Sequence, residues 1–110
     1  MGRKVPELVI RQFDICRLKG RPAPVSLVVI LQSDQLAPLK SRIAAPLIKT
    51  EAASKHFKYN PVVELDGQSY YLAIEQLSML PIMAIGPRVG SAVIDEYRIK
   101  RALDLVFFGS

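Results

Sequence analysis

The chain of 110 residues has one cysteine, one histidine and no tryptophan. A single cysteine excludes an internal disulfide, and one cysteine with one histidine cannot close a zinc shell. The longest apolar stretch, residues 79–85, falls far short of the roughly 20 residues of a membrane span, and the N-terminus lacks the apolar core of a secretory signal. The sequence therefore predicts no metal, no cofactor, no membrane contact and a reducing, cytoplasmic location.

Motifs of catalytic sites are missing as well. The chain has no GxGxxG, GxxxxGK[ST] or GxSxG, so nucleotide cradles and nucleophile elbows have no support. His56 stands in a lysine-rich segment without a second positioned group, which favours a solvated loop histidine over a general base. Cys16 lies on a predicted strand with nothing to activate its thiolate, so we expect a small core residue. These absences favour a binding protein over an enzyme.

The composition is that of a packed domain with an excess of positive charge. Half of the residues are hydrophobic and 23% are charged, which excludes disorder of the whole chain and predicts one domain over residues 1–110. So large an apolar share in a small chain favours a covered surface, most simply in a homodimer. Lys and Arg number 15 against 10 acidic residues, a balance that attracts acidic partners without selecting one. The basic residues are scattered, as on a solvated surface.

Turn residues at short intervals predict a mainly antiparallel β fold. The expected strands are residues 8–18, 25–32, 41–48, 62–65, 68–74 and 82–85. The first two should form a hairpin, and Asp66-Gly67 should make a tight turn between 62–65 and 68–74. Pro46 places the third strand at a sheet edge or a bulge. Residues 50–58 are expected to form a loop, and Gly86-Pro87 should end the last strand.

The hydrophobic period changes in the last fifth of the chain and predicts a helix over residues 91–108. One apolar stripe has the spacing of a core-facing side: Ile99, Ala102, Leu103 and Val106. The opposite face gathers another set: Tyr97, Arg101, Asp104 and Phe108. An aromatic residue on that face cannot serve the same core, so we expect Phe108 to be exposed at the end of the helix.

A colinear set of short motifs runs from about residue 11 to residue 110. The motifs are Gln12-Phe13, Val29, Gln32-Ser33-Asp34, Pro46-Leu47, Pro61-Val62-Val63, Pro81, Ile85-Gly86 and the run Ile99-Lys100-Arg101-Ala102-Leu103-Asp104-Leu105-Val106-Phe107-Phe108-Gly109. In order and spacing they resemble the CcdB toxins of bacterial type II toxin–antitoxin modules. The resemblance implies an SH3-like antiparallel barrel of the CcdB and Kid type, with a small extra sheet, one C-terminal helix and a tight homodimer.

The resemblance also implies a function without catalysis. Proteins of this family bind the A subunit of DNA gyrase and trap its complex with cleaved DNA. They are neutralised by a CcdA-like antitoxin, and the toxin–antitoxin complex, not the toxin alone, binds operator DNA to repress the operon. A basic surface suits an acidic antitoxin segment that orders on binding.

The family's gyrase-contacting positions carry over onto seven residues of this chain. They are Gln35, Leu36, Asp104, Phe107, Phe108, Gly109 and Ser110, and the helix face adds Tyr97 and Arg101. The glycine is kept, whereas Phe108 stands where the family has tryptophan and Asp104 where it has asparagine.

Two other functions remain open at this point. The first is a non-toxic or retargeted homologue that keeps antitoxin binding. The second is a toxin that cleaves messenger RNA, because barrels of this broad shape also serve such toxins and the positive charge tolerates RNA. Its nominal acid–base residues are His56, Glu64 and nearby lysines.

Overall fold

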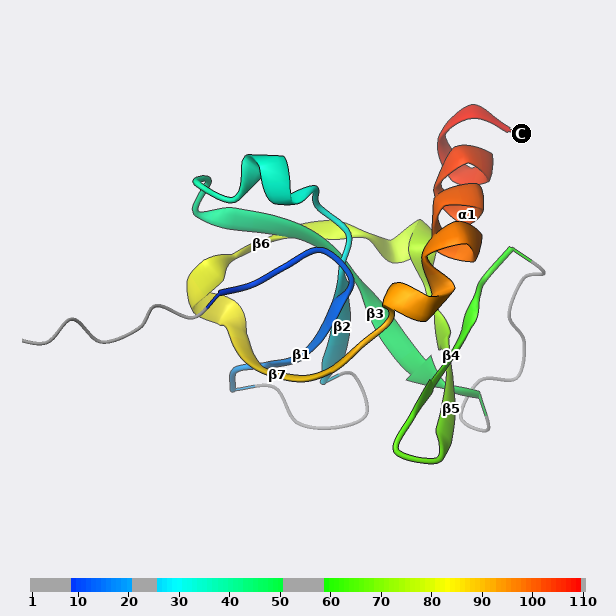
Figure 1. Cartoon of the computed structure of the whole chain (residues 1–110), viewed down its shortest axis with the longest axis horizontal. Coiled ribbons are helices and arrows are strands. Elements are labelled where there is room, and N and C mark those ends of the chain that lie inside the picture. Colours follow the sequence, from blue (N-terminus) through cyan, green and yellow to red (C-terminus); the bar gives the residue numbers. More distant parts are fainter. Residues whose placement is uncertain (1–8, 21–25, 51–58, 110) are drawn as a thin grey trace, which may run out of the picture.

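A computed structural model describes residues 9–20, 26–50 and 59–109. Within these ranges, seven strands precede one helix (Figure 1). The strands are β1 (Asp14–Leu18), β2 (Leu27–Ile30), β3 (Ser41–Lys49), β4 (Val62–Leu65), β5 (Gln68–Leu72), β6 (Ser78–Pro81) and β7 (Ile85–Ser91). Short 3-10 turns are η1 (Asp34–Leu36), η3 (Ile74–Gln76), η4 (Ile82–Ala84) and η5 (Val93–Asp95), and the helix is α1 (Glu96–Phe108). No helix among the described residues is long and apolar enough to cross a membrane.

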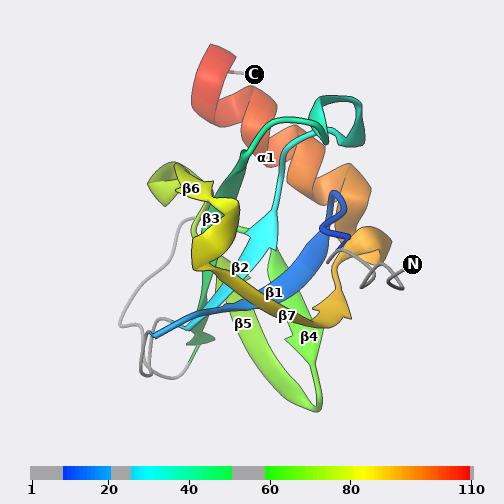
Figure 2. The ribbon, with the colours of Figure 1, turned by 90° about the vertical axis from the view of Figure 1, so that its left-hand side faces the viewer.

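The strands pair antiparallel in the order β4-β5-β3-β2-β1-β7, and β6 also pairs with β3. The first half of β3 pairs with β6 and its last three residues pair with β5. This change of partner lets the sheet curl into a half-barrel with α1 at one side (Figures 1 and 2). The β4–β5 hairpin with the end of β3 forms the small extra sheet, so the expected fold class is confirmed.

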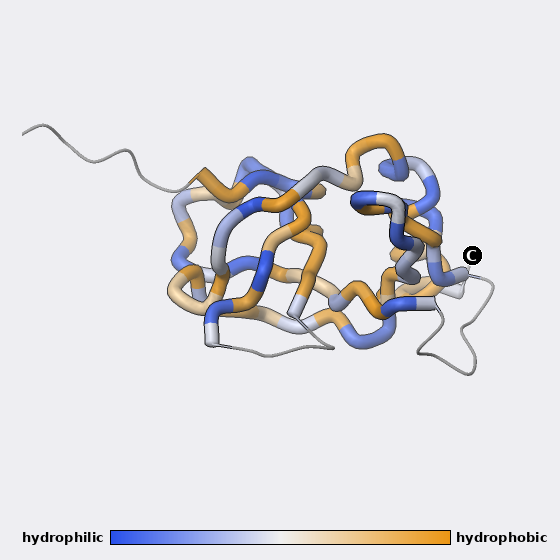
Figure 3. Tube along the Cα trace, turned by 90° about the horizontal axis from the view of Figure 1, so that it is seen from below, coloured by the Kyte–Doolittle hydropathy of each residue, from blue (hydrophilic) through white to orange (hydrophobic). Residues whose placement is uncertain are grey.

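Successive residues of the strands point to opposite faces of the sheet and supply an apolar core on each face. Figure 3 shows the hydrophobic residues interspersed with hydrophilic ones along the trace. The larger core fills the concave side and includes Ile15, Val29, Leu47, Leu72 and Ile99. The smaller core lies on the other face and includes Cys16, Val28, Ile30, Ala44 and Ile85. Neighbours along a strand thus serve different cores, which fixes the register of the sheet.

The hairpin predictions are confirmed. β1 and β2 pair antiparallel. The first strand is shorter than expected, however: residues 9–13 are not part of it, because the chain turns at Phe13 (φ 72°) and β1 begins at Asp14. Asp66 (φ 51°) and Gly67 (φ 77°) join β4 to β5 with two positive φ angles, the backbone that an Asp-Gly turn favours. The expected loop over residues 51–58 lies outside the described residues.

The predictions for residues 78–91 and for Pro46 are wrong. Residues 82–84 form η4, whereas β7 runs through Gly86 and Pro87, where irregular pairing with β1 accommodates the proline. A Cβ at Gly86 would lie 2.9 Å from the Arg17 carbonyl oxygen, so this close approach requires glycine. Strand β6 was not predicted. Pro46 lies in the middle of the sheet, at the point where β3 changes partner, which tolerates its missing N–H.

The helix begins at Glu96 rather than at residue 91, because Ser91 still belongs to β7 and η5 intervenes. Ile99 and Ala102 are buried and Leu103 packs against the larger core, as the apolar stripe predicts. Val106 is 36% exposed, so the apolar stripe of the helix continues beyond the point where the core ends. The helix ends at Gly109, whose φ of 80° closes the last turn with a hydrogen bond from its N–H to the Leu105 carbonyl.

Candidate functional site

The last turns of α1 extend beyond the sheet (Figure 1). They expose large apolar side chains to solvent. Phe107 is 59% exposed and Phe108 is 80% exposed, and Leu105 and Val106 beside them are also exposed. The two phenylalanine rings are tilted, with centroids 6.3 Å apart. The predicted exposure of Phe108 is therefore confirmed, and α1 offers an apolar tip of four residues that no described side chain covers.

The predicted polar face of α1 is exposed as expected. Tyr97, Arg101 and Asp104 all face solvent. The Arg101 guanidinium carbon lies 5.9 Å from the centre of the Tyr97 ring, and its Nη1 donates a hydrogen bond to the Tyr97 hydroxyl over 3.4 Å. This hydrogen bond is the main reason why the pKa of Arg101 is raised above its usual value. The face thus combines an aromatic ring, a fixed cation and a carboxylate.

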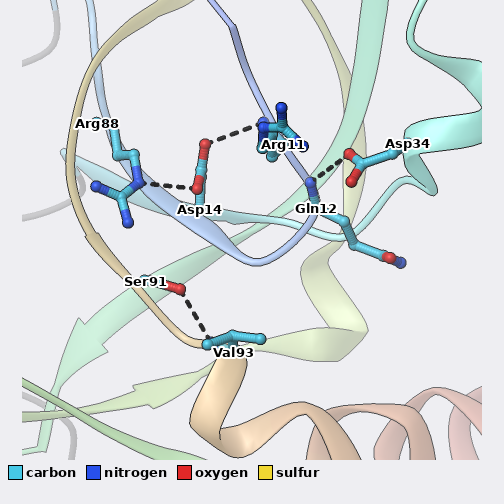
Figure 4. Close-up of polar contacts among 7 residues, drawn as sticks. All are labelled: Arg11, Gln12, Asp14, Asp34, Arg88, Ser91 and Val93. Carbon is cyan, nitrogen blue, oxygen red and sulfur yellow. Dashed lines mark hydrogen bonds and ion pairs between the residues drawn. The ribbon is translucent and has the colours of Figure 1, made fainter.

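Gln35 and Leu36 lie on η1, and both are exposed. Two hydrogen bonds stabilise η1. The Ser33 hydroxyl accepts a hydrogen bond from the Gln35 N–H (3.1 Å), and Asp34 Oδ1 accepts one from the Gln12 N–H (2.8 Å), as Figure 4 shows for the latter pair. The polar Ser-Asp pair thereby fixes the two residues that follow it.

The buried side chains of Arg42 and Gln32 hold the segment after η1 in place through hydrogen bonds to its main chain. The Arg42 side chain is buried, and its guanidinium donates to three main-chain carbonyls, those of Ala37 (3.0 Å), Leu39 (2.6 Å) and Ser41 (2.9 Å). Gln32 Nε2 donates to the Ser41 carbonyl over 3.1 Å, and its Oε1 accepts from the Ile43 N–H over 3.2 Å. The sequence motif includes Gln32 but does not reveal its role, and Arg42 was not singled out, because hydrogen bonds to main-chain carbonyl groups require no particular residue type in the partner.

An ion pair between the buried Asp14 and the exposed Arg88 joins the start of β1 to β7. The Asp14 carboxylate accepts hydrogen bonds from the Arg11 N–H and from Arg88 Nε, each over 2.9 Å (Figure 4). Cys16 lies beside this pair and is 1% exposed, which confirms its predicted place in a core. Burial first, and the Asp14 charge second, raise the pKa of its thiol to about 11. Cys16 is therefore a protonated thiol near neutral pH.

The tip of α1 and η1 lie on the same side of the molecule but apart from each other (Figures 1 and 2). Within one chain they are two separate patches, so a partner that contacts both has to span the space between them. Gly109 is exposed at the end of α1, whereas Ser110 lies outside the described residues.

The nominal acid–base residues are not brought together in the described part of the chain. Glu64 is exposed on β4, and its carboxylate accepts a 2.6 Å hydrogen bond from the Ser69 hydroxyl. His56 lies outside the described residues. The described ranges also contain no group of three side chains suited to hold a metal ion.

The half-barrel with a C-terminal helix is the fold of small bacterial toxins. A crystal structure of a toxin from "Mtb" matches with a TM-score of 0.69 and 16% identity over 84% of this chain and 99% of that one. An endoribonuclease in complex with its cognate antitoxin, from a mycobacterial species, matches with a TM-score of 0.73 and 11% identity over 89% and 94%. The Mycobacterium tuberculosis toxin MazF-mt6 matches with a TM-score of 0.70 and 17% identity over 86% and 95%.

The sequence itself identifies the family. The family model described as CcdB protein matches residues 12–109, nearly the whole chain. The chain belongs to the CcdB family, whose members are toxins of toxin–antitoxin modules. No curated protein matches the chain significantly.

Proposed function

We propose that this CcdB-family toxin binds the A subunit of DNA gyrase through the tip of α1 and through η1, and traps the complex of gyrase with cleaved DNA. The observation that carries the proposal is the exposed tip, because Phe107 and Phe108 remain 59% and 80% exposed although both are large apolar residues. Exposed aromatic anchors beside a cation are typical of the centre of a protein interface. A poison of this kind contributes no catalytic group of its own.

Each contact residue has a role in this proposal. Phe107 and Phe108 are the apolar anchors, and Gly109 lets the chain turn away beyond them. Tyr97, Arg101 and Asp104 supply polar contacts along the helix, and the second patch adds Gln35 and Leu36, the latter 47% exposed. Ser110 completes the set as the last residue of the chain. Because Asp104 is charged, it requires a cation on the partner to offset its desolvation.

Two substitutions toward the family pattern test how strong the contact is. Phe108→Trp enlarges the aromatic surface available to a stacked cation, and Asp104→Asn removes a carboxylate from the contact area. If no arginine or lysine of gyrase faces Asp104, each change should strengthen binding by about 1 kcal/mol, roughly fivefold. A weaker complex after Asp104→Asn would instead show that gyrase pairs with the carboxylate.

The deciding experiment combines growth and biochemistry. Expression of the intact chain should arrest growth, and purified protein should raise gyrase-dependent DNA cleavage in vitro. A well-folded protein that does neither, but still binds its antitoxin tightly, would be the retargeted or non-toxic homologue. The α1 variants described above serve as the internal comparison.

The partners follow from the same proposal. The toxin acts as a homodimer, which places two copies of the α1 tip and of η1 on one particle, and a CcdA-like antitoxin neutralises it. The excess of 15 basic over 10 acidic residues favours an acidic antitoxin segment that orders as it binds. Operator DNA is bound only by the toxin–antitoxin complex.

Cleavage of messenger RNA is the second candidate, favoured by the likeness in fold to endoribonucleases of 11% and 13% identity. It requires an acid–base pair, for which Glu64 offers a carboxylate already engaged by Ser69. Metal-independent cutting of RNA by purified protein, abolished by Glu64→Gln or by a change at His56, would select this function over gyrase poisoning.

A further inference from the structure

A hollow of about 410 Å³ opens at the end of the half-barrel opposite the tip of α1. Its wall includes Arg17, Leu27, Lys49, Leu65, Asp66 and Tyr70. These residues come from the end of β1, the start of β2, the end of β3 and the β4–β5 hairpin, which meet at the lower side of Figure 1. The volume lies within the range of sites that hold small ligands.

The hollow is the mouth of the half-barrel, because two of its residues lie on the same strand faces as residues of the larger core, nearer the strand ends. Arg17 follows Ile15 by two residues on β1, and Lys49 follows Leu47 by two residues on β3. Since side chains two apart on a strand share a face, both cations stand on the face that is apolar further in. Leu27 and Leu65 form apolar wall between them, and Leu65 also packs against the larger core.

The two cations of the mouth take no part in the ion pairs of the described residues. Arg17 and Lys49 are exposed, and the ion pairs among the described residues join Arg88 with Asp14, Arg98 with Asp95 and Lys100 with Glu96, not these two. Asp66 on the β4–β5 turn is the carboxylate of the wall, so two cations face one anion there. A mouth of this kind attracts an anionic group and also offers an acceptor to a donor group on the same ligand.

We propose that this mouth binds a nucleotide. Arg17 and Lys49 would take the phosphate, for which a guanidinium fork and an ammonium are the usual partners. The apolar wall and the Tyr70 ring would take the flat face of the base, and the Asp66 carboxylate would accept a hydrogen bond from the sugar or base. An acidic peptide is a poorer fit, because its carboxylate side chains offer no flat ring to the apolar wall and to Tyr70.

The site is separate from the gyrase surface and needs no catalytic step. A thymidine oligomer serves as the probe because it lacks the 2′-hydroxyl that RNA cleavage requires, so binding is measured apart from any nuclease activity. Fluorescence anisotropy with the full chain should show binding that Arg17→Gln with Lys49→Gln weakens at least tenfold. The slope of log affinity against log salt should fall by about 0.7, because the two cations hold one phosphate and each phosphate contact on a single strand contributes about 0.7.

The matched control is a double variant that removes one arginine and one lysine outside the mouth. Arg11 and Lys40 are exposed cations that precede β1 and β3, whereas Arg17 and Lys49 lie at or near the far ends of those strands. Arg11→Gln with Lys40→Gln should change affinity less than twofold, and equal losses in the two double variants would overturn the proposal. So would displacement of the oligomer by polyglutamate at equal charge, which would assign the mouth to an acidic peptide.

Nuclear magnetic resonance of the unmodified protein gives a second measurement that needs no variant. Thymidine monophosphate should shift the amides of Lys49, Gln68 and Tyr70 and leave those of α1 unchanged. Equal affinity for the mononucleotide and the oligomer would indicate a free nucleotide, and a tighter oligomer a strand; both support the site. Shifts spread over the surface, or identical shifts with inorganic phosphate, would overturn it.

Discussion

At the scale of single residues, the side chains that fix the candidate site differ from those that would contact a partner. Gln35 and Leu36 are exposed, whereas Arg42 and Gln32, which fasten the segment behind them, are buried. The Arg42 guanidinium satisfies three main-chain carbonyl groups. A partner surface on a loop therefore depends on a buried cation that the partner need not touch.

Replacing Arg42 tests that dependence. Arg42→Met leaves three carbonyls without their donor, and each buried group that loses its partner costs about 1–3 kcal/mol. Allowing for water entry, we expect the free energy of unfolding to fall by roughly 2–3 kcal/mol in urea titrations. Lys40→Met, an exposed neighbour, should change it by less than about 0.5 kcal/mol. Similar effects of the two variants would contradict the role of Arg42.

Cys16 predicts a dependence of stability on alkaline pH. Its pKa is raised from 9.0 to about 11 in the folded protein, so the folded state keeps its proton after the unfolded chain has lost it. The stability that Cys16 contributes is therefore complete below pH 9 and declines as the pH rises toward 11. Because other groups titrate there, the measurement is the difference between wild type and Cys16→Ala in urea unfolding at pH 8 and pH 10.5. A difference independent of pH would contradict this account.

At the scale of elements, α1 carries two functions on one helix. Its first half buries Ile99 and Ala102 in the larger core, and its last turn exposes Phe107 and Phe108. The helical period predicts the exposed Phe108, because that inference needs only the geometry of one helix. It does not predict the exposure of Val106, because the core ends before the apolar stripe does.

Two substitutions separate these halves. Ile99→Ala removes a fully buried side chain and should lower the free energy of unfolding by about 2–5 kcal/mol. Phe108→Ala should leave stability within about 0.5 kcal/mol of wild type, because the ring is 80% exposed, yet weaken gyrase binding at least tenfold. Urea unfolding and a gyrase A binding titration measure both quantities on both proteins. A large loss of stability in Phe108→Ala would show that the ring is part of the fold.

Local signals predict most elements, and long-range pairing decides the rest. Asp66-Gly67 specifies its own turn, so the β4–β5 hairpin follows from the sequence. Pro46 predicts an edge strand from the sequence alone. In the structure it lies in the middle of the sheet, because β3 changes its pairing partner at this residue. Strand β7 crosses Gly86-Pro87 only because an irregular pairing with β1 makes room. Such features depend on neighbours distant in sequence and carry no local pattern.

At the scale of the whole molecule, the exposed apolar surface predicts a dimer. Besides the tip of α1, Met79 (66% exposed), Met83 (84%) and Ile94 (89%) face solvent on the described surface. So many large apolar groups on a small chain favour burial between two copies. Light scattering at micromolar concentration should give about twice the 12.2 kDa mass of the chain. A monomer at that concentration would contradict the proposed arrangement of paired contact surfaces.

The central claim is that the exposed tip of α1 holds gyrase on cleaved DNA. The most direct measurement is the amount of DNA cleaved by purified gyrase in the presence of wild-type protein, Phe108→Ala and Phe108→Trp. We predict that the wild type raises cleavage, that Phe108→Ala requires at least tenfold more protein for the same effect, and that Phe108→Trp requires less. Cleavage that stays at the level of gyrase alone with all three folded proteins would contradict the claim.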